Sequence, residues 1–178
     1  MQLATREEPA APVPDDLEKA YQNHSGLVFR TAYRITGNAA DAEDVLQTVF
    51  LRLVRRDAAA AVLENQESYL RRAAVNTALD IVRSKQIARS VPLEDAPARS
   101  VTEPSDEASR EAKDCLRRAL AQLNHREAEV FTLRFFEGHS NPEIARMLGI
   151  SQVHVAVILH RSRKQLQKEV RSYMGGRS

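Results

Sequence analysis

Apolar residues recur at helical spacing along most of the chain and divide it into two blocks. In the first block, periods of three and four residues predict three helices. The first ends at Gly37, a residue suited to the left-handed conformation that closes a helix. Asn38 is expected to cap the second helix, and the third covers about residues 66–85. The third helix has an apolar stripe that consists of Leu70, Ala73, Ala74, Thr77 and Ile81.

A segment without a sustained period separates the two blocks. Its sequence, IARSVPLEDAPARSVTEP, has three prolines and scattered charge, which predicts a flexible and slightly acidic linker. The first fourteen residues also hold three prolines and predict a disordered leader. The predicted partition is a leader at 1–14, a first domain at 15–87, a linker at 88–104, a second domain at 105–173 and a tail at 174–178.

The last sixty residues predict a helix-turn-helix. A helix in REAEVFTLRFFEG is followed by a short helix in SNPEIARMLG, where Ser140 and Glu143 form a candidate capping box. Gly149 is expected to turn the chain, and Ser151 to cap the final helix. Such an arrangement presents its last helix to the major groove of DNA, although a purely structural helical hairpin has the same pattern.

The final helix has one apolar face and an opposite face that is only partly polar. Helical spacing predicts that five residues hold this helix against Ile144 and Leu148. These inward residues are Val155, Ile158, Leu159, Ser162 and Leu166. The residues left to face outward are Gln152, Val153, Ala156, Val157, His160, Arg161 and Lys164.

Composition supports a helical, cytoplasmic protein. The chain has 178 residues, of which 43% are hydrophobic and 28% charged, with six glycines and no Trp. It shows neither a long apolar run nor a signal peptide. The single cysteine, Cys115, lies in an apolar helical stripe, and we interpret it as an inert core residue rather than a nucleophile.

Positive charge is concentrated near the C-terminus. Residues 15–88 hold ten acids and ten bases, whereas residues 151–178 hold six bases and one acid, a net charge of +5. A basic stretch of this kind is compatible with a solvated helix face or with a surface that binds a polyanion. The helix-turn-helix pattern favours binding to DNA.

Three stretches, in this order, resemble the signature segments of bacterial extracytoplasmic function (ECF) sigma factors of the sigma-70 superfamily. They are DAEDVLQTVFLRL, YLRRAAVNTALDIVR and LNHREAEVFTLRFFEGHSNPEIARMLGISQVHVAVILHRSRKQL. The resemblance covers roughly residues 15–170. It implies an all-α fold of two small helical domains, a region 2 bundle and a region 4 helix-turn-helix, joined by a flexible linker.

The resemblance also implies a function in transcription initiation. The expected partners are core RNA polymerase and promoter DNA, and an anti-sigma factor is a further candidate. The protein is expected not to be an enzyme, to need no cofactor or metal, to bind no small-molecule substrate and not to insert into a membrane.

Matching positions to the family assigns candidate site residues. Core polymerase binding is assigned to Asp44, Gln47, Thr48 and Phe50, although Thr48 replaces a residue that is commonly acidic. Contact with the −10 element is assigned to Arg71, Arg72, Asn76, Asp80 and Arg83. Asn76 matches best, and its amide offers both a donor and an acceptor to a base edge. For Asp80 and Arg83, a simple surface ion pair is an alternative.

Contact with the −35 element is assigned to the final helix, where the chain departs from the family. Apolar residues stand where the family usually has polar ones, whereas His160, Arg161 and Arg163 keep the pattern. The candidate residues are Gln152, Val153, His154, Ala156, Val157, His160, Arg161, Arg163 and Lys164. Few polar contacts to bases are therefore expected.

Two other classes of function are compatible with parts of the sequence. A dimeric helix-turn-helix regulator would use the C-terminal block but would not need the DAEDVLQTVF helix or the polar face that carries Asn76. An enzyme is disfavoured because the sequence has no nucleophile–base pattern, no glycine-rich phosphate loop and no metal-ligand spacing. His154 and His160, six residues apart, do not share a helical face.

Overall fold

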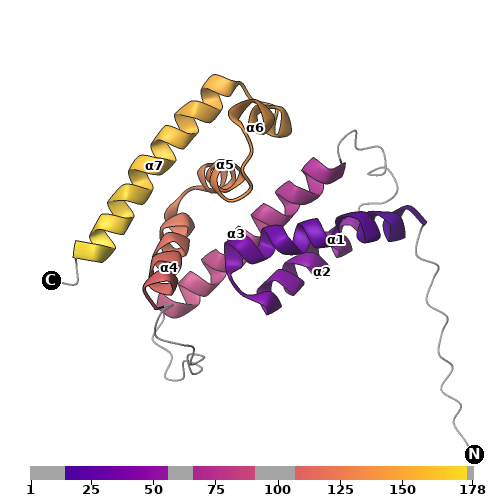
Figure 1. Cartoon of the computed structure of the whole chain (residues 1–178), viewed down its shortest axis with the longest axis horizontal. Coiled ribbons are helices and arrows are strands. Elements are labelled where there is room, and N and C mark those ends of the chain that lie inside the picture. Colours follow the sequence, from indigo (N-terminus) through magenta and orange to yellow (C-terminus); the bar gives the residue numbers. More distant parts are fainter. Residues whose placement is uncertain (1–14, 56–65, 91–106, 176–178) are drawn as a thin grey trace, which may run out of the picture.

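The computed structural model describes residues 15–55, 66–90 and 107–175, and within these ranges it contains seven helices and no strand (Figure 1). The all-α prediction is confirmed. The helices are α1 Asp15–Thr36, α2 Ala39–Arg55, α3 Gln66–Ser90, α4 Glu107–Gln122, α5 His125–Phe135, α6 Asn141–Leu148 and α7 Gln152–Gly175.

The first three helices form a bundle in which each contacts the other two. Its core is made of branched aliphatic side chains, among them Ile35 on α1, Val45 on α2 and Leu70 on α3, all fully buried. The predicted stripe of α3 is inward, with Leu70, Ala74 and Thr77 buried. However, Val75 and Leu79 are buried as well, because α3 also lies against α4 and α5 (Figure 1).

The α1–α2 junction confirms the predicted helix boundary. Gly37 has a φ of 67°, a left-handed conformation in which a side chain is strained. Asn38 caps α2, since its Oδ1 accepts a hydrogen bond from the Asp41 backbone N at 3.0 Å. A Cβ atom at position 37 would also lie 1.9 Å from Nη2 of Arg117 on α4. The left-handed turn therefore favours glycine here, whereas the end of the flexible Arg117 side chain could move away from a larger residue.

The last four helices form the second unit, in which α7 packs on α4, α5 and α6. The predicted caps are present. Ser140 and Glu143 form a reciprocal capping box, and Gly149 ends α6 with a φ of 63°. The Ser151 hydroxyl accepts a hydrogen bond from the His154 backbone N at 3.1 Å. The helix-turn-helix geometry was therefore readable from local sequence.

One helix is longer than predicted. α3 continues to Ser90, five residues beyond the predicted end at Lys85 and into the predicted linker. No residue before Pro92 interrupts a helix, and a proline disfavours helical backbone at the residue before it. The predicted leader at 1–14, the rest of the linker and most of the tail lie outside the described residues.

No single helix in the described ranges has the length and hydropathy to cross a membrane. Only α6 and α7 taken together pass such a test, and they are bent by 106° relative to each other.

Candidate polymerase and nucleic-acid interfaces

The recognition helix α7 is held by the residues that the sequence predicted. Val155 and Ser162 are fully buried, and Ile158, Leu159 and Leu166 nearly so. The Ser162 hydroxyl donates to the Ile158 backbone O at 2.8 Å, which satisfies a polar group inside the core. The inward face of α7 is therefore structural.

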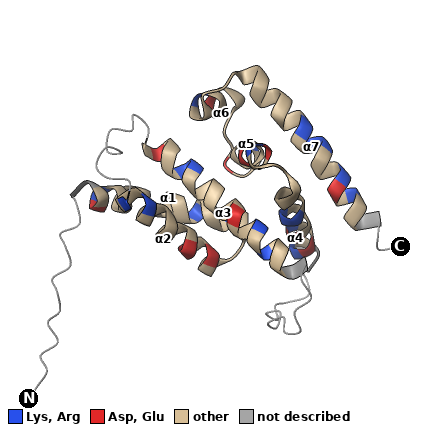
Figure 2. Cartoon of the chain, turned by 180° about the vertical axis from the view of Figure 1, so that it is seen from behind, with Lys and Arg blue, Asp and Glu red and all other residues tan. Residues whose placement is uncertain are grey.

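The opposite face of α7 is exposed, as predicted, and begins with apolar residues. Val153 is 74% exposed and Val157 is 41% exposed. Figure 2 shows no basic residue in the first turns of α7, and blue appears only further along the helix. The guanidinium of Arg163 lies 4.9 Å from the centre of the Phe135 ring, a cation–π distance. The other outward candidates, Gln152, His154, Ala156, His160, Arg161 and Lys164, are exposed too.

The candidate polymerase-binding residues on α2 fall into two groups. Asp44 and Gln47 are exposed, and neither makes a hydrogen bond or ion pair with the part of the chain that the structure describes. Thr48 is half-buried. Phe50 is only 7% exposed and packs edge-on against Tyr21, with ring centroids 5.0 Å apart. Phe50 therefore supports the bundle core, whereas Asp44 and Gln47 are free to bind a partner.

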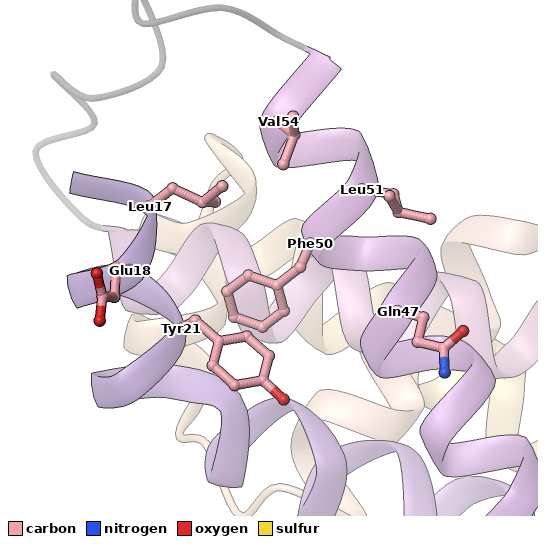
Figure 3. Close-up of a pocket in the computed structure, with 7 residues that line it drawn as sticks. All are labelled: Leu17, Glu18, Tyr21, Gln47, Phe50, Leu51 and Val54. Carbon is pink, nitrogen blue, oxygen red and sulfur yellow. The ribbon is translucent and has the colours of Figure 1, made fainter. Parts of the chain in front are cut away.

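An apolar groove of about 500 Å³ lies beside Gln47, between the start of α1 and the end of α2 (Figure 3). Its lining consists of Leu17, Glu18, Tyr21, Gln47, Phe50, Leu51 and Val54. Sequence reasoning did not select Tyr21, Leu51 or Val54, although each is about half exposed. The sequence signal that could have indicated them is the run of nearly continuous apolar residues at the end of α2, which one buried face cannot accommodate.

Four of the five candidate −10 residues on α3 contact the second unit, and Asp80 is the one that faces solvent. Nε of Arg72 and Nδ2 of Asn76 both donate to Oε1 of Glu129 on α5, at 3.0 and 3.1 Å. Nη1 of Arg72 also donates to the Met147 backbone O at 3.1 Å. The Glu129 side chain is only 3% exposed. The polar face of α3 is therefore covered by the second unit.

A second buried carboxylate covers the start of the same face. Glu137, directly after α5, has a side chain with no exposed surface and accepts hydrogen bonds from Arg71 on α3 and from Thr31 and Arg34 on α1. Sequence reasoning missed both glutamates as site residues. The only sequence signal was a glutamate, Glu129, within the largely apolar run AEVFTL.

Arg83 and Asp80 at the far end of the face form the ion pair that was considered as an alternative. Nη1 of Arg83 lies 3.6 Å from Oδ1 of Asp80, at the long end of such contacts. However, Nη2 of Arg83 also donates to the backbone O of Leu123, at 3.3 Å. Arg83 thus joins the two units, and Asp80 remains exposed.

His139 and Glu143 line a hollow between the two units, and their pKa values, with that of the nearby Glu67, are displaced. Burial lowers the pKa of His139, and the nearby charge of Arg71 lowers it further. A hydrogen bond from Arg71 holds the pKa of Glu67 below its usual value, and hydrogen bonds from Ser140 do the same for Glu143. In the described residues, no group of three or more His, Cys, Asp or Glu is arranged to hold a metal ion.

Comparison with known protein families defines the class of protein. Residues 20–87 match Sigma-70 region 2, and residues 113–166 match Sigma-70, region 4. The two regions correspond to the bundle and to the unit that holds the helix-turn-helix.

Individual relatives narrow the class. The chain is 30% identical to the RNA polymerase sigma-E factor of Streptomyces avermitilis over 88% of this chain and 86% of that protein. It is 34% identical to the ECF RNA polymerase sigma factor SigE of Mycolicibacterium smegmatis, over 92% of this chain and 64% of the relative. It is 30% identical to SigL of Mycobacterium tuberculosis, another ECF sigma factor, over 79% and 80% of the two chains.

The chain therefore belongs to the ECF sigma factors of the sigma-70 family, which are alternative sigma factors for transcription initiation. One solved structure, the RsbN–BldN complex, matches over 85% of this chain and 89% of the other at 24% identity. The TM-score of this match is 0.32.

Proposed function

We propose that this chain binds core RNA polymerase, directs it to promoters through the −10 and −35 elements, and promotes strand opening. The observation that carries the proposal is the surface of α2, where Asp44 and Gln47 are exposed without partners in the described chain. A regulator that acted only through its helix-turn-helix would have no use for such a surface. Polar groups that need no internal partner are available to a second protein.

The groove beside Gln47 supports the same assignment. Tyr21, Leu51 and Val54 expose apolar surface next to polar residues, a composition typical of the centre and rim of a protein–protein interface. An apolar centre supplies binding free energy, and the neighbouring polar residues set orientation. In this proposal, the polymerase covers both the polar positions on α2 and part of the groove.

The −35 element is assigned to the exposed face of α7. The N-terminal end of a recognition helix contacts base edges in the major groove. Here the exposed side chains at that end include Val153, Ala156 and Val157, which pack against thymine methyl groups but supply no hydrogen-bond code. The later Arg161 and Lys164 are suited to phosphate contacts, which position the protein without reading sequence.

The −10 element is assigned to the polar face of α3. Guanidinium groups bind phosphate or stack on bases, and the Asn76 amide is suited to a base edge that strand opening exposes. This face is available to DNA only when the second unit has moved away from it.

Transcription with purified components tests the proposal. Core RNA polymerase, the full-length chain and genomic promoter fragments are expected to give run-off transcripts that core polymerase alone does not produce. Size-exclusion chromatography is expected to show the chain co-eluting with core polymerase. A chain that elutes as a dimer, binds promoter DNA without polymerase and does not associate with core would instead support the regulator.

A further inference from the structure

We propose that the chain, when free of polymerase, is autoinhibited by its own second unit, because Glu129 and Glu137 occupy the groups of α3 that the −10 element would bind. This inference rests on the proposed function of the α3 face and concerns the regulation of that site. The two carboxylates stand in for the negatively charged DNA backbone. The closed arrangement and DNA binding at α3 therefore exclude each other.

Glu137 is the more specific of the two contacts. Its carboxylate is fully buried, and the side chains that donate to it, Thr31, Arg34 and Arg71, all belong to the first unit. Within the described residues, its side chain makes no hydrogen bond to the second unit, to which it belongs. The folding of that unit therefore does not explain why a glutamate is buried at this position. A contact between the two units does explain it.

Glu129 completes the cover over the middle of the face. Its Oε1 accepts from both Arg72 and Asn76, and its Oε2 is 3.2 Å from Nη1 of Arg126 on its own helix. Arg126 in turn donates to the Leu148 backbone O at 3.3 Å, which anchors this carboxylate to the helix-turn-helix. The same carboxylate thus connects the recognition unit to two predicted −10 residues.

Backbone acceptors of the second unit take one further hydrogen bond from each of two arginines on this face. Arg72 reaches the Met147 O, and Arg83 reaches the Leu123 O. In the opposite direction, Nε of Arg117 donates to the Ile35 O of the first unit at 3.0 Å. All three arginines of the predicted −10 face are therefore engaged by the second unit, together with Asn76.

The chemistry of the contact makes it reversible. Buried ion pairs recover little more than the free energy lost on dehydrating the charges, so their net contribution to closure is small when the alternative is a hydrated surface. Removing one partner is much more unfavourable, because it leaves the other charge buried and unpaired. A ligand that binds only the open form, such as core polymerase, shifts the equilibrium by its preference for that form. Closure then lasts only until polymerase is bound.

A distance measurement on the full-length chain tests closure without reference to transcription. Cys115→Ala removes the single native cysteine, and Asn23→Cys with Lys168→Cys places spin labels on exposed positions of α1 and α7. We expect one narrow distance distribution for the otherwise wild-type chain by double electron–electron resonance. Glu137→Gln removes the charge but retains the shape, and it is expected to give a broader distribution shifted to longer distances.

Two further variants serve as a control and as a second test in the distance measurement. Glu43→Gln makes the same charge change at an exposed position of α2 and should leave the distribution narrow. Arg34→Gln removes one donor to Glu137 and should broaden the distance distribution less than Glu137→Gln does. If circular dichroism shows that Glu137→Gln has lost helicity, the result for Arg34→Gln decides the test. A broad distribution in the wild type, or distributions that neither Glu137→Gln nor Arg34→Gln changes, would overturn autoinhibition.

Masking of the α3 face is measured with single-stranded poly(dT) of about 20 nucleotides, a probe that detects exposed cationic surface. Glu137→Gln is expected to bind it roughly tenfold more tightly than the wild type does, because opening frees the arginines. Equal affinities would overturn masking. Failure of the proposed function would look different. An opened variant would then bind the probe more tightly but would support no transcription with core polymerase.

Discussion

Asn76 donates a hydrogen bond to Glu129 across the contact between the two helical units, at 3.1 Å, while its own oxygen is buried and has no hydrogen-bond partner among the described residues. The donor half of the amide is therefore used in the closed form and the acceptor half is not. A base edge offers partners to both halves. In the closed arrangement, Asn76, the residue assigned to a base edge, therefore lacks a hydrogen bond to its side-chain oxygen among the described residues.

Replacing Asn76 should affect promoter opening more than folding. Asn76→Ala is expected to reduce open-complex formation on duplex promoter by about tenfold, the scale of one good base contact. The loss should be smaller on a template whose −10 region is already unpaired, because that template needs no strand opening. Permanganate footprinting on both templates measures this difference. Ser84→Ala, at an exposed position of the same helix, serves as the control. Equal losses on the two templates would exclude a role in melting.

The α2 surface should contribute to assembly rather than to stability. Asp44→Ala combined with Gln47→Ala is expected to weaken binding to core polymerase roughly tenfold, because interface polar groups of this kind contribute about 1 kcal/mol or more. Helicity and melting temperature should hardly change, since both side chains are exposed and unpaired in the described chain. Fluorescence anisotropy with labelled protein measures the affinity, and Asn23→Ala on α1 is the surface control. A double variant that unfolds, or one that binds core normally, would contradict the assignment.

The apolar outward face of α7 should give a −35 preference based on thymine methyl groups and DNA shape. In a selection from a randomised −35 library, the wild type is expected to favour T-rich elements. Ala156→Arg with Val157→Ser should change the preferred sequence while leaving the buried Val155 and Leu159 undisturbed. Selection of the same G-rich element by the wild type and the double variant would show that these residues are not the readers.

Phosphate contacts by α7 should be visible in the salt dependence of binding. Arg161→Ala is expected to lower affinity for all promoter sequences and to reduce the slope of log K against log salt by about one unit. The measurement is a salt titration of holoenzyme binding to a −35 duplex. Glu169→Gln, which removes no cation, should not reduce this slope. A change in sequence preference with an unaltered slope would instead indicate that Arg161 contacts bases.

Stability should depend on pH through His139. Burial and Arg71 lower its pKa below the ordinary 6.5, so the folded protein resists a proton that the unfolded chain accepts. Well above pH 6.5, His139 is neutral in both states and does not change the free energy of unfolding. As the pH falls below 6.5 towards the lower pKa of the folded state, the unfolded chain takes up the proton first, and the free energy of unfolding decreases. Glu137, Glu143 and Glu67 favour the proton and reduce the effect, but they do not reverse it.

His139→Gln is the variant that tests this dependence. Its melting temperature should fall less than that of the wild type between pH 7.5 and pH 5.5, because glutamine takes up no proton. The backbone contacts of residue 139, from its N to the Leu133 O and from Arg134 to its O, are retained. Differential scanning calorimetry at the two pH values provides the comparison, and parallel melting temperatures for the two proteins would contradict it.

Local sequence determined the caps around the helix-turn-helix and the exposed face of α7, although it placed the end of α3 five residues too early. Ser140 and Glu143 are three residues apart, and Gly149 and Ser151 act on their immediate neighbours, so their capping geometry depends on chemistry within one turn. The period of α7 separated its buried from its exposed residues, because a helix repeats its faces every 3.6 residues. For α3, the same period predicted the buried side that includes Leu70 and Ala74 but not the second buried side, which includes Val75 and Leu79.

The tertiary structure alone decided what covers the −10 face. Asn76 and Glu129 are 53 residues apart in sequence, and Arg71 and Glu137 are 66 apart. No local pattern links them, because whether a charged side chain is hydrated or buried depends on what packs against it. The sequence therefore identified Arg72, Asn76, Asp80 and Arg83 as a polar face of α3, and the packing of the second unit turned all of this face except Asp80 into a contact between the two units.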